Sequence, residues 1–264
     1  MGEIKKKAKE YYDMYRIWRK RPGSTFKEIS DIYRKRPILN KAYKSALEML
    51  KKDQEMFEHV CDALLSTISK EKVSKDEDII KNLSKEDDEI NEYASDVRRH
   101  ILEYLAENSA PDVKSSLVLT SLIIDLERLG DYTKDLAKIT LFDPVNLFDG
   151  GYLDIIREYK EHLVKMFENT VVAFGQHDKD TAENVMKMNK EFRERTDKIL
   201  LEVNEDSRLR KRDAITYTLM TRYFRRVAGH LENIASSVIS PFPYIGFKKR
   251  ELEKQKGKRE KGKK

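Results

Sequence analysis

Residues 111–140 carry the stretch that decides the fold, PDVKSSLVLTSLIIDLERLGDYTKDLAKIT. Pro111 and Asp112 mark a turn, and apolar residues follow it at helical spacing. At about 100° per residue, the apolar side chains fall on one narrow stripe. The members of this stripe are Leu122, Leu126, Leu129, Thr133 and Leu136. A helix with a single apolar stripe buries it against other helices, so the stretch predicts a helical bundle.

The same periodicity extends in both directions along the chain. It predicts helices over 38–70, 76–108, 112–140, 152–175, 179–205 and 209–240. The segment FDPVNLFDGG, residues 142–151, is the clearest break, and Pro241 and Pro243 end the last helix. The joints near Asp178 and Asp206 are each expected to supply an N-cap for the helix that follows.

Three helices, a break and three more helices indicate a duplicated unit. When residues 119–137 are laid over 217–235, Arg128 falls on Arg226 and Ala137 on Ala235, and the apolar Leu126 and Leu129 fall on Phe224 and Val227. We therefore predict an all-α protein made of two tandem antiparallel three-helix bundles. The predicted regions are a basic and aromatic extension over 1–37, bundles over 38–143 and 152–247, and a basic tail over 248–264.

Charge dominates the composition of this 264-residue chain, which has 53 Lys and Arg against 47 Asp and Glu. Residues 1–36 and 248–264 each carry a local charge of +7, so the body between them carries −8 although the whole chain is +6. No apolar run approaches the roughly 20 residues of a membrane-spanning helix, and the lone Cys61 cannot form an internal disulfide. We expect a cytoplasmic protein, with peripheral attachment at the inner face of the membrane left open.

An acidic ridge follows the third helix, away from its leucine stripe. Glu127, Asp131 and Asp135 are spaced four residues apart, and Asp87 and Asn91 on the preceding helix share that spacing. Like charges at this spacing repel, and a bound cation would reverse the effect. Lys134 and Lys138 are expected to do little to neutralise the ridge. With 47 acids in the chain, a plain solvated face is the alternative to a metal site.

Several motifs together resemble one known family. LERLGDY, residues 126–132, is similar to the L-E-R-I-G-D signature of the PhoU family of phosphate-uptake regulators. Asp112-Val113-Lys114 and Asp87-xx-Ile90-Asn91 stand where the family has similar motifs. RYFRRVAGHLENIA, residues 222–235, resembles the family's second signature in degraded form. The similarity covers residues 38–247.

The resemblance implies paired three-helix bundles and metal clusters held on the bundle surface. Carried over by position, the expected ligands in the first bundle are Asp87, Asn91, Glu127 and Asp131, with Asp135 as a neighbour. The expected metals are divalent or ferric ions such as iron, zinc or nickel. The family also implies a regulator of phosphate uptake that docks to the ATPase subunit of a phosphate ABC transporter or to another phosphate-signalling protein. The acidic ridge motivates the further hypothesis that metal assists this docking.

The second bundle departs from this pattern, since the corresponding positions hold Asn189, Arg193, Arg225 and Gly229. Guanidinium groups offer no lone pair, so metal is expected in the first bundle only. Arg193, Arg225 and Arg226 form a candidate anion-binding patch. The alternative pairs them with Glu191, Glu194 or Glu232 as surface ion pairs.

No glycine-rich phosphate loop, paired-histidine zinc motif or nucleophile elbow is present, so the chain is not expected to be an enzyme. A nucleic-acid-binding helical protein that uses its basic ends is the alternative function, and those ends are equally able to attach to a membrane surface. For residues 1–36, docking on the acidic body of the same chain is the favoured alternative to both. Pairing of bundle faces between copies, giving a homo-oligomer, is also left open.

Overall fold

The computed structural model describes residues 35–69, 76–109, 111–142, 147, 150–240, 242, 245 and 246. All six predicted helices are present in them, and this part of the chain contains no β-strand. The helices are α3 (Pro37–Ser69), α4 (Asp76–Glu107), α5 (Val113–Ala137), α6 (Tyr152–Gln176), α7 (Lys179–Glu205) and α8 (Lys211–Ile239), with a 3-10 turn, η1 (Lys138–Phe142), after α5. The predictions for residues 1–34 and 248–264 concern residues outside this part.

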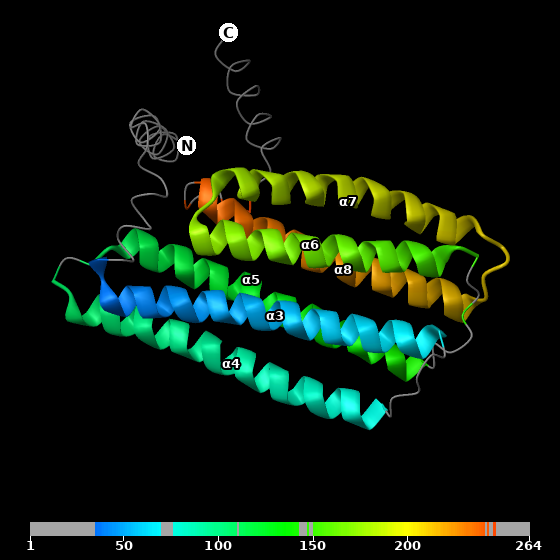
Figure 1. Ribbon diagram of the computed structural model, residues 1–264, viewed down its shortest axis with the longest axis horizontal. Coiled ribbons are helices and arrows are strands. Elements are labelled where there is room, and N and C mark those ends of the chain that lie inside the picture. The colour runs from blue at the N-terminus through cyan, green and yellow to red at the C-terminus, as the bar shows by residue number, and fades with distance from the viewer. Residues whose placement is uncertain are drawn as a thin grey trace, which may run out of the picture.

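The helices form two antiparallel bundles of three, α3–α5 and α6–α8, so the predicted fold class is confirmed (Figure 1). The bundles lie lengthwise against each other. In Figure 1, α3 and α6 lie in front, α5 and α8 lie behind them, and α4 and α7 form the two outer edges. Most contacts between the bundles therefore come from α3 with α6 and from α5 with α8.

Aromatic side chains join the two bundles at the centre of the core. Phe57 of α3 lies with its ring centroid 5.4 Å from Phe167 of α6 and 5.8 Å from Phe224 of α8. All three side chains are buried. Tyr43 of α3 adds a second link, because its hydroxyl donates a hydrogen bond to the Phe174 carbonyl of α6. The bundles thus share one continuous apolar core.

A polar contact joins α5 to α8 behind this core. Asp125 accepts hydrogen bonds from His230 Nδ1 at 2.7 Å and from Asn233 Nδ2 at 2.8 Å. The His230 ring also stacks on Tyr132, with 5.6 Å between centroids, and Tyr132 in turn packs against Tyr223. These contacts help to fix the register of α5 against α8.

Helix ends follow local sequence in most places. Asp112 caps α5 by accepting from the Ser115 amide, and Asp178 caps α7 as predicted. The N-cap predicted near Asp206 is wrong, because α8 begins only at Lys211 and its N-cap residue, Arg210, makes no side-chain cap. Asp206 instead ends α7, where its carboxylate accepts from the Arg208 guanidinium and the Tyr152 hydroxyl.

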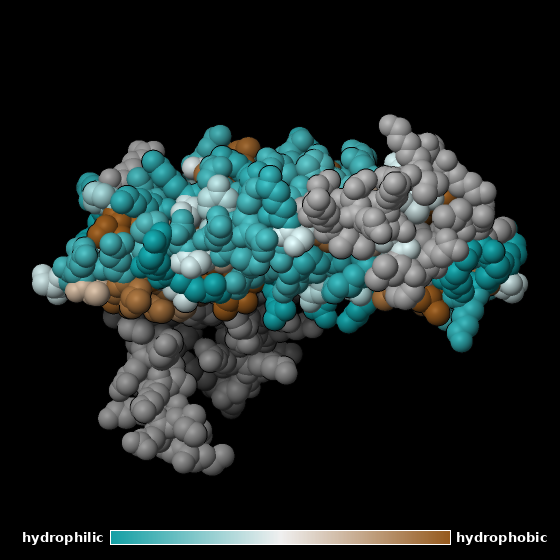
Figure 2. All heavy atoms as spheres, turned by 90° about the horizontal axis from the view of Figure 1, so that it is seen from below, coloured by the Kyte–Doolittle hydropathy of each residue, from teal (hydrophilic) through white to brown (hydrophobic). Residues whose placement is uncertain are grey.

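The surface on the α4 side of the molecule is mostly hydrophilic, with small, separated hydrophobic patches (Figure 2). Charged residues at three- and four-residue spacing supply many of the surface ion pairs, such as Lys165 with Glu168. Among the described residues, no helix is both long enough and apolar enough to cross a membrane.

Candidate cation site in the first bundle

Lys134 lies between the two acidic motifs of the first bundle. Its Nζ atom is 2.9 Å from Asp87 Oδ1 of α4 and 3.2 Å from Asp131 Oδ1 of α5. Partial burial acts to lower the pKa of Lys134, but the hydrogen bonds and negative charges of the two carboxylates outweigh it and raise the pKa. Lys134 is therefore a charged ammonium that links α4 to α5.

The other predicted ligands also have partners. Glu127 Oε2 is 2.6 Å from Arg98 Nη2 of α4, and Asp135 Oδ1 is 2.7 Å from Lys138 Nζ. Asn91 Nδ2 lies 3.4 Å from Asp87 Oδ2. The structure thus brings Asp87, Asn91 and Asp131 to one place between α4 and α5, with Glu127 on the same side of α5 but paired to Arg98, and Asp135 paired within its own helix.

The expectation that Lys134 and Lys138 do little to neutralise the ridge is wrong. Each lysine follows an aspartate by three residues, which places its ammonium beside that carboxylate. Lys134 also reaches across to α4, which spacing along one helix does not reveal.

Asp53 of α3 lies beneath this arrangement and was not singled out in the sequence. Its side chain is fully buried, and neither carboxylate oxygen has a hydrogen-bond partner. Gly130 of α5 leaves room for it, since a Cβ atom there would lie 3.3 Å from Asp53 Oδ1. Burial raises the pKa of Asp53 well above its usual range, and the charges of Asp87 and Asp131 raise it further. We call Asp53, Asp87, Asp131 and Lys134 the Lys134 cluster.

A signal for Asp53 was present in the sequence of α3. Buried apolar residues recur on one face of this helix, among them Met49, Leu50, Met56 and Phe57. Asp53 falls on that face at helical spacing, so it is an acidic residue at a core position. Burying an unpaired carboxylate at such a position lowers the stability of the folded protein. A buried polar group without a hydrogen-bond partner therefore calls for an explanation, such as a functional role or a bound water or ion.

As they stand, these side chains do not fit a bound metal ion. Among the described residues, no three Asp, Glu, His or Cys side chains converge closely enough to hold one. The Lys134 ammonium also lies between the carboxylates that a bridging cation would need. The five-residue metal site stays a prediction.

The second bundle has a different polar arrangement. Asn189 of α7 is fully buried, and its Nδ2 donates a hydrogen bond to Glu232 of α8. Arg225 pairs with Asp197 of α7 rather than with a glutamate, so the predicted glutamate pairing is wrong for this residue. Arg193, Arg225 and Arg226 as an anion-binding patch stay a prediction.

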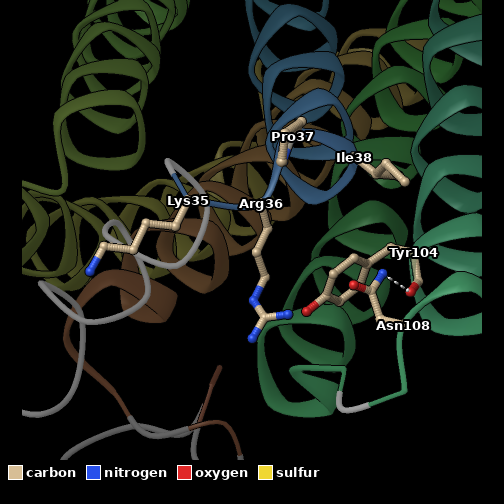
Figure 3. Close-up of a pocket in the computed structure, with 6 residues that line it drawn as sticks. All are labelled: Lys35, Arg36, Pro37, Ile38, Tyr104 and Asn108. Atoms are coloured by element: carbon tan, nitrogen blue, oxygen red, sulfur yellow. Dashed lines mark hydrogen bonds between the residues drawn. The ribbon is translucent and has the colours of Figure 1, made fainter.

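A shallow depression lies at the start of α3, away from the Lys134 cluster (Figure 3). It has a volume of about 380 Å³, and its lining includes Arg36, Tyr104 and Asn108. The Arg36 guanidinium lies 5.6 Å from the Tyr104 ring centroid, and the Lys35 side chain points away from that ring. With its cation already placed over an aromatic ring, the depression shows no set of converging polar groups.

Comparison with known proteins shows the family. A family model described as the PhoU domain matches residues 46–140 and, a second time, residues 156–238. The chain belongs to the PhoU family. The two matches also support the internal repeat, since each falls within one of the PhoU bundles.

Relatives and solved structures agree with this membership. The chain is 25% identical over 175 residues to a phosphate-specific transport system accessory protein PhoU homolog of Pseudomonas aeruginosa, covering 63% of this chain and 71% of the relative. The homolog of Clostridium acetobutylicum is 21% identical over 175 residues, covering 62% and 78%. The crystal structure of PhoU from Pseudomonas aeruginosa gives a TM-score of 0.66 at 22% identity, covering 79% of this chain and 97% of that one. PhoU from Streptococcus pneumoniae, a phosphate transport system regulatory protein, gives 0.65 at 18%, covering 79% and 95%.

Aligning the two PhoU repeats shows which residues of the second repeat correspond to the Lys134 cluster. Laid over each other from their first matched residues, 46 and 156, they put Met56 and Phe57 on Met166 and Phe167, and Asp53 on Leu163. Laid over from their last matched residues, 140 and 238, they put Lys134 on Glu232 and Asp131 on Gly229. At these positions the second repeat therefore has neither of the two aspartates and an acid in place of the lysine.

Proposed function

We propose that this chain is an accessory regulator of phosphate uptake that acts by docking to the ATPase subunit of a phosphate transporter. Membership of the PhoU family supports this, as do relatives named as accessory proteins of the phosphate-specific transport system. Docking, rather than catalysis, suits a body built from long helices that present wide faces to a partner.

The observation that carries the docking proposal is an exposed apolar stripe on α5. Val113, Leu117 and Ile124 are 51%, 44% and 56% exposed, and they share one face of the helix. We call these three residues the α5 stripe. In a chain this rich in charge, large apolar side chains grouped on one helix face mark an interaction surface. The stripe lies on the same helix as the Lys134 cluster, but outside the buried core.

Replacing Leu117 and Ile124 together by glutamate is expected to weaken docking at least about tenfold. The physical reason is that two charges would have to be desolvated against the partner's apolar surface. The measurement is the dissociation constant of the full chain for the transporter's ATPase subunit from the same organism, by biolayer interferometry. The matched control is Leu201→Glu on α7, which is 63% exposed and lies on the other bundle.

The control is expected to bind as the unchanged protein does. Equal loss in both variants would mean that added negative charge alone weakens binding, and no loss in either would remove the α5 stripe from the interface. Circular dichroism of both variants checks that the exposed substitutions leave the fold intact.

Removal of residues 1–36 and 248–264 separates docking from nucleic-acid binding. A regulator that docks through its helices is expected to keep its partner after this truncation. A nucleic-acid-binding protein would lose a strongly salt-dependent affinity instead, because its positive ends release counterions on binding. Binding to a mixed-sequence DNA duplex and to the ATPase subunit, each at two salt concentrations, distinguishes the two.

The sequence predicts that metal assists this docking. In the structure each predicted ligand already has a partner, so docking by the α5 stripe is proposed without a metal step.

A further inference from the structure

We propose that the N-terminal extension of this chain covers the α5 stripe of the same molecule until a partner displaces it. The covering segment is residues 9–20, which hold the only tryptophan of the chain, Trp18. The regulatory meaning of this contact rests on the proposed function, because a segment that lies on the α5 stripe competes with the ATPase subunit. The contact itself can be measured without the transporter.

The extension joins the helical body next to the beginning of α5. The Arg36 guanidinium lies 5.6 Å from the ring centroid of Tyr104, which is buried near the end of α4 (Figure 3). The Tyr104 hydroxyl accepts a hydrogen bond at 2.8 Å from the backbone amide of Asp112, the N-cap residue of α5. Val113, the first member of the α5 stripe, follows directly. Arg36 therefore places the end of the extension only two contacts away from the start of the stripe.

The chain before Arg36 is long enough to lie along the stripe. From Val113 to Ile124 the stripe extends about 16 Å along α5. Residues 19–34 connect Trp18 to the described part of the chain, and a segment of this length spans up to about 50 Å when it is extended. Such a tether keeps Trp18 at a high effective concentration near the stripe, so individually weak contacts are enough to hold the segment there.

The segment also has the chemistry that fits the α5 stripe. Four of its apolar residues are spaced as on one face of a helix, and three basic residues are spaced as on the opposite face. The apolar residues are Tyr11, Met14, Tyr15 and Trp18, and the basic residues are Lys9, Arg16 and Lys20. An amphipathic segment of this kind lays its apolar side on an apolar surface and keeps its charges in water.

Charge favours a contact within the chain as well. Residues 1–34 hold ten Lys and Arg against five Asp and Glu, whereas the body carries a charge of −8. Close to the start of the stripe, Glu103 and Glu107 are exposed on the last turns of α4, the helix that leads into α5. The basic residues of the segment therefore meet a negative surface, and the contact is expected to weaken as the salt concentration rises.

Trp18 makes the contact measurable in the full chain, because no other tryptophan contributes to the fluorescence. The measurements are the emission spectrum and the quenching by acrylamide. Replacing Leu117 and Ile124 together by glutamate is expected to move the emission to longer wavelength and to raise the quenching constant at least about twofold, because Trp18 loses its apolar cover. The matched control, Leu201→Glu on α7, is expected to leave both unchanged.

Other positions of the segment give different results. Equal changes in both variants would reduce the effect to added negative charge, and no change in either would show that Trp18 does not lie on the α5 stripe. Protection of Trp18 that grows with protein concentration would assign the segment to a second copy of the chain. Protection that appears only with anionic lipid vesicles, or only with a DNA duplex, would assign it to a membrane surface or to nucleic acid. Each of these results overturns the proposal.

The regulatory consequence is measured separately, as the dissociation constant of the full chain for the ATPase subunit. Tyr15→Ser combined with Trp18→Ser is expected to bind at least about threefold more tightly than the unchanged protein, because a covered stripe lowers the fraction of molecules that can bind. The matched control is Tyr12→Ser, which falls outside the apolar face at helical spacing. Equal affinity of the double variant and the unchanged protein would contradict competition for the stripe. If Trp18 is protected and no variant binds the ATPase subunit, the docking proposal fails and the contact within the chain stands. If binding is intact and Trp18 is unprotected, only the contact within the chain fails.

Discussion

Replacing Phe57 by alanine will lower the free energy of unfolding by about 4 kcal/mol. The Phe57 ring is fully buried and packs against Phe167 and Phe224, which belong to the other bundle. Its removal leaves a cavity where α3, α6 and α8 meet. Because each of these helices also packs against other helices, they cannot move together to fill it. Urea unfolding followed by circular dichroism at 222 nm measures the change.

Two further variants test whether the loss of stability comes from the core contact between the bundles. Leu102→Ala, at a 70% exposed position on α4, is expected to change stability by less than about 0.5 kcal/mol. Phe57→Ala combined with Phe167→Ala is expected to cost less than the sum of the two, because the rings contact each other. A loss under about 1 kcal/mol for Phe57→Ala would contradict the shared core and point to bundles that unfold as separate units.

The helices could be predicted from the sequence because each carries its own local signals. Asp112 and Asp178 cap the helices that follow them, and the apolar stripe of α5 sets the face that it buries. The start of α8 was placed too early because Asp206 resembles a cap and yet binds Arg208 and Tyr152. An aspartate at a joint has several partners available, and spacing does not select among them.

The candidate site could be predicted only in part, for a related reason. The four-residue spacing of the acids correctly placed Asp87 and Asp131 where α4 and α5 meet. It did not reveal Lys134 as their common partner, because that contact depends on how far one helix is shifted along the other. The spacing of the surface acids does not point to Asp53, whose signal is instead its position on the apolar face of α3.

Replacing Asp53 by leucine will stabilise the protein at neutral pH by about 2 kcal/mol or more. Because the pKa of Asp53 is raised in the folded protein, the folded state keeps its proton over a pH range in which the unfolded chain has released it. The unfolded state therefore binds fewer protons there, and the stability of the unchanged protein falls as pH rises. The fall begins near the unfolded pKa, about 3.9, and ends once the pH passes the folded pKa.

The difference between Asp53→Leu and the unchanged protein should accordingly grow with pH by up to about 1.4 kcal/mol for each unit. Urea unfolding at several values between pH 4.5 and 7.5 measures it, and Glu103→Gln, at an exposed position on α4, is expected to show no such trend. The groups that face Asp53 are Asp87 and Asp131, both held by Lys134. If the difference in the free energy of unfolding does not change with pH across this range, Asp53 is ionised in the folded protein. Ionisation there requires a cation close enough to the carboxylate to offset both its burial and the two neighbouring negative charges.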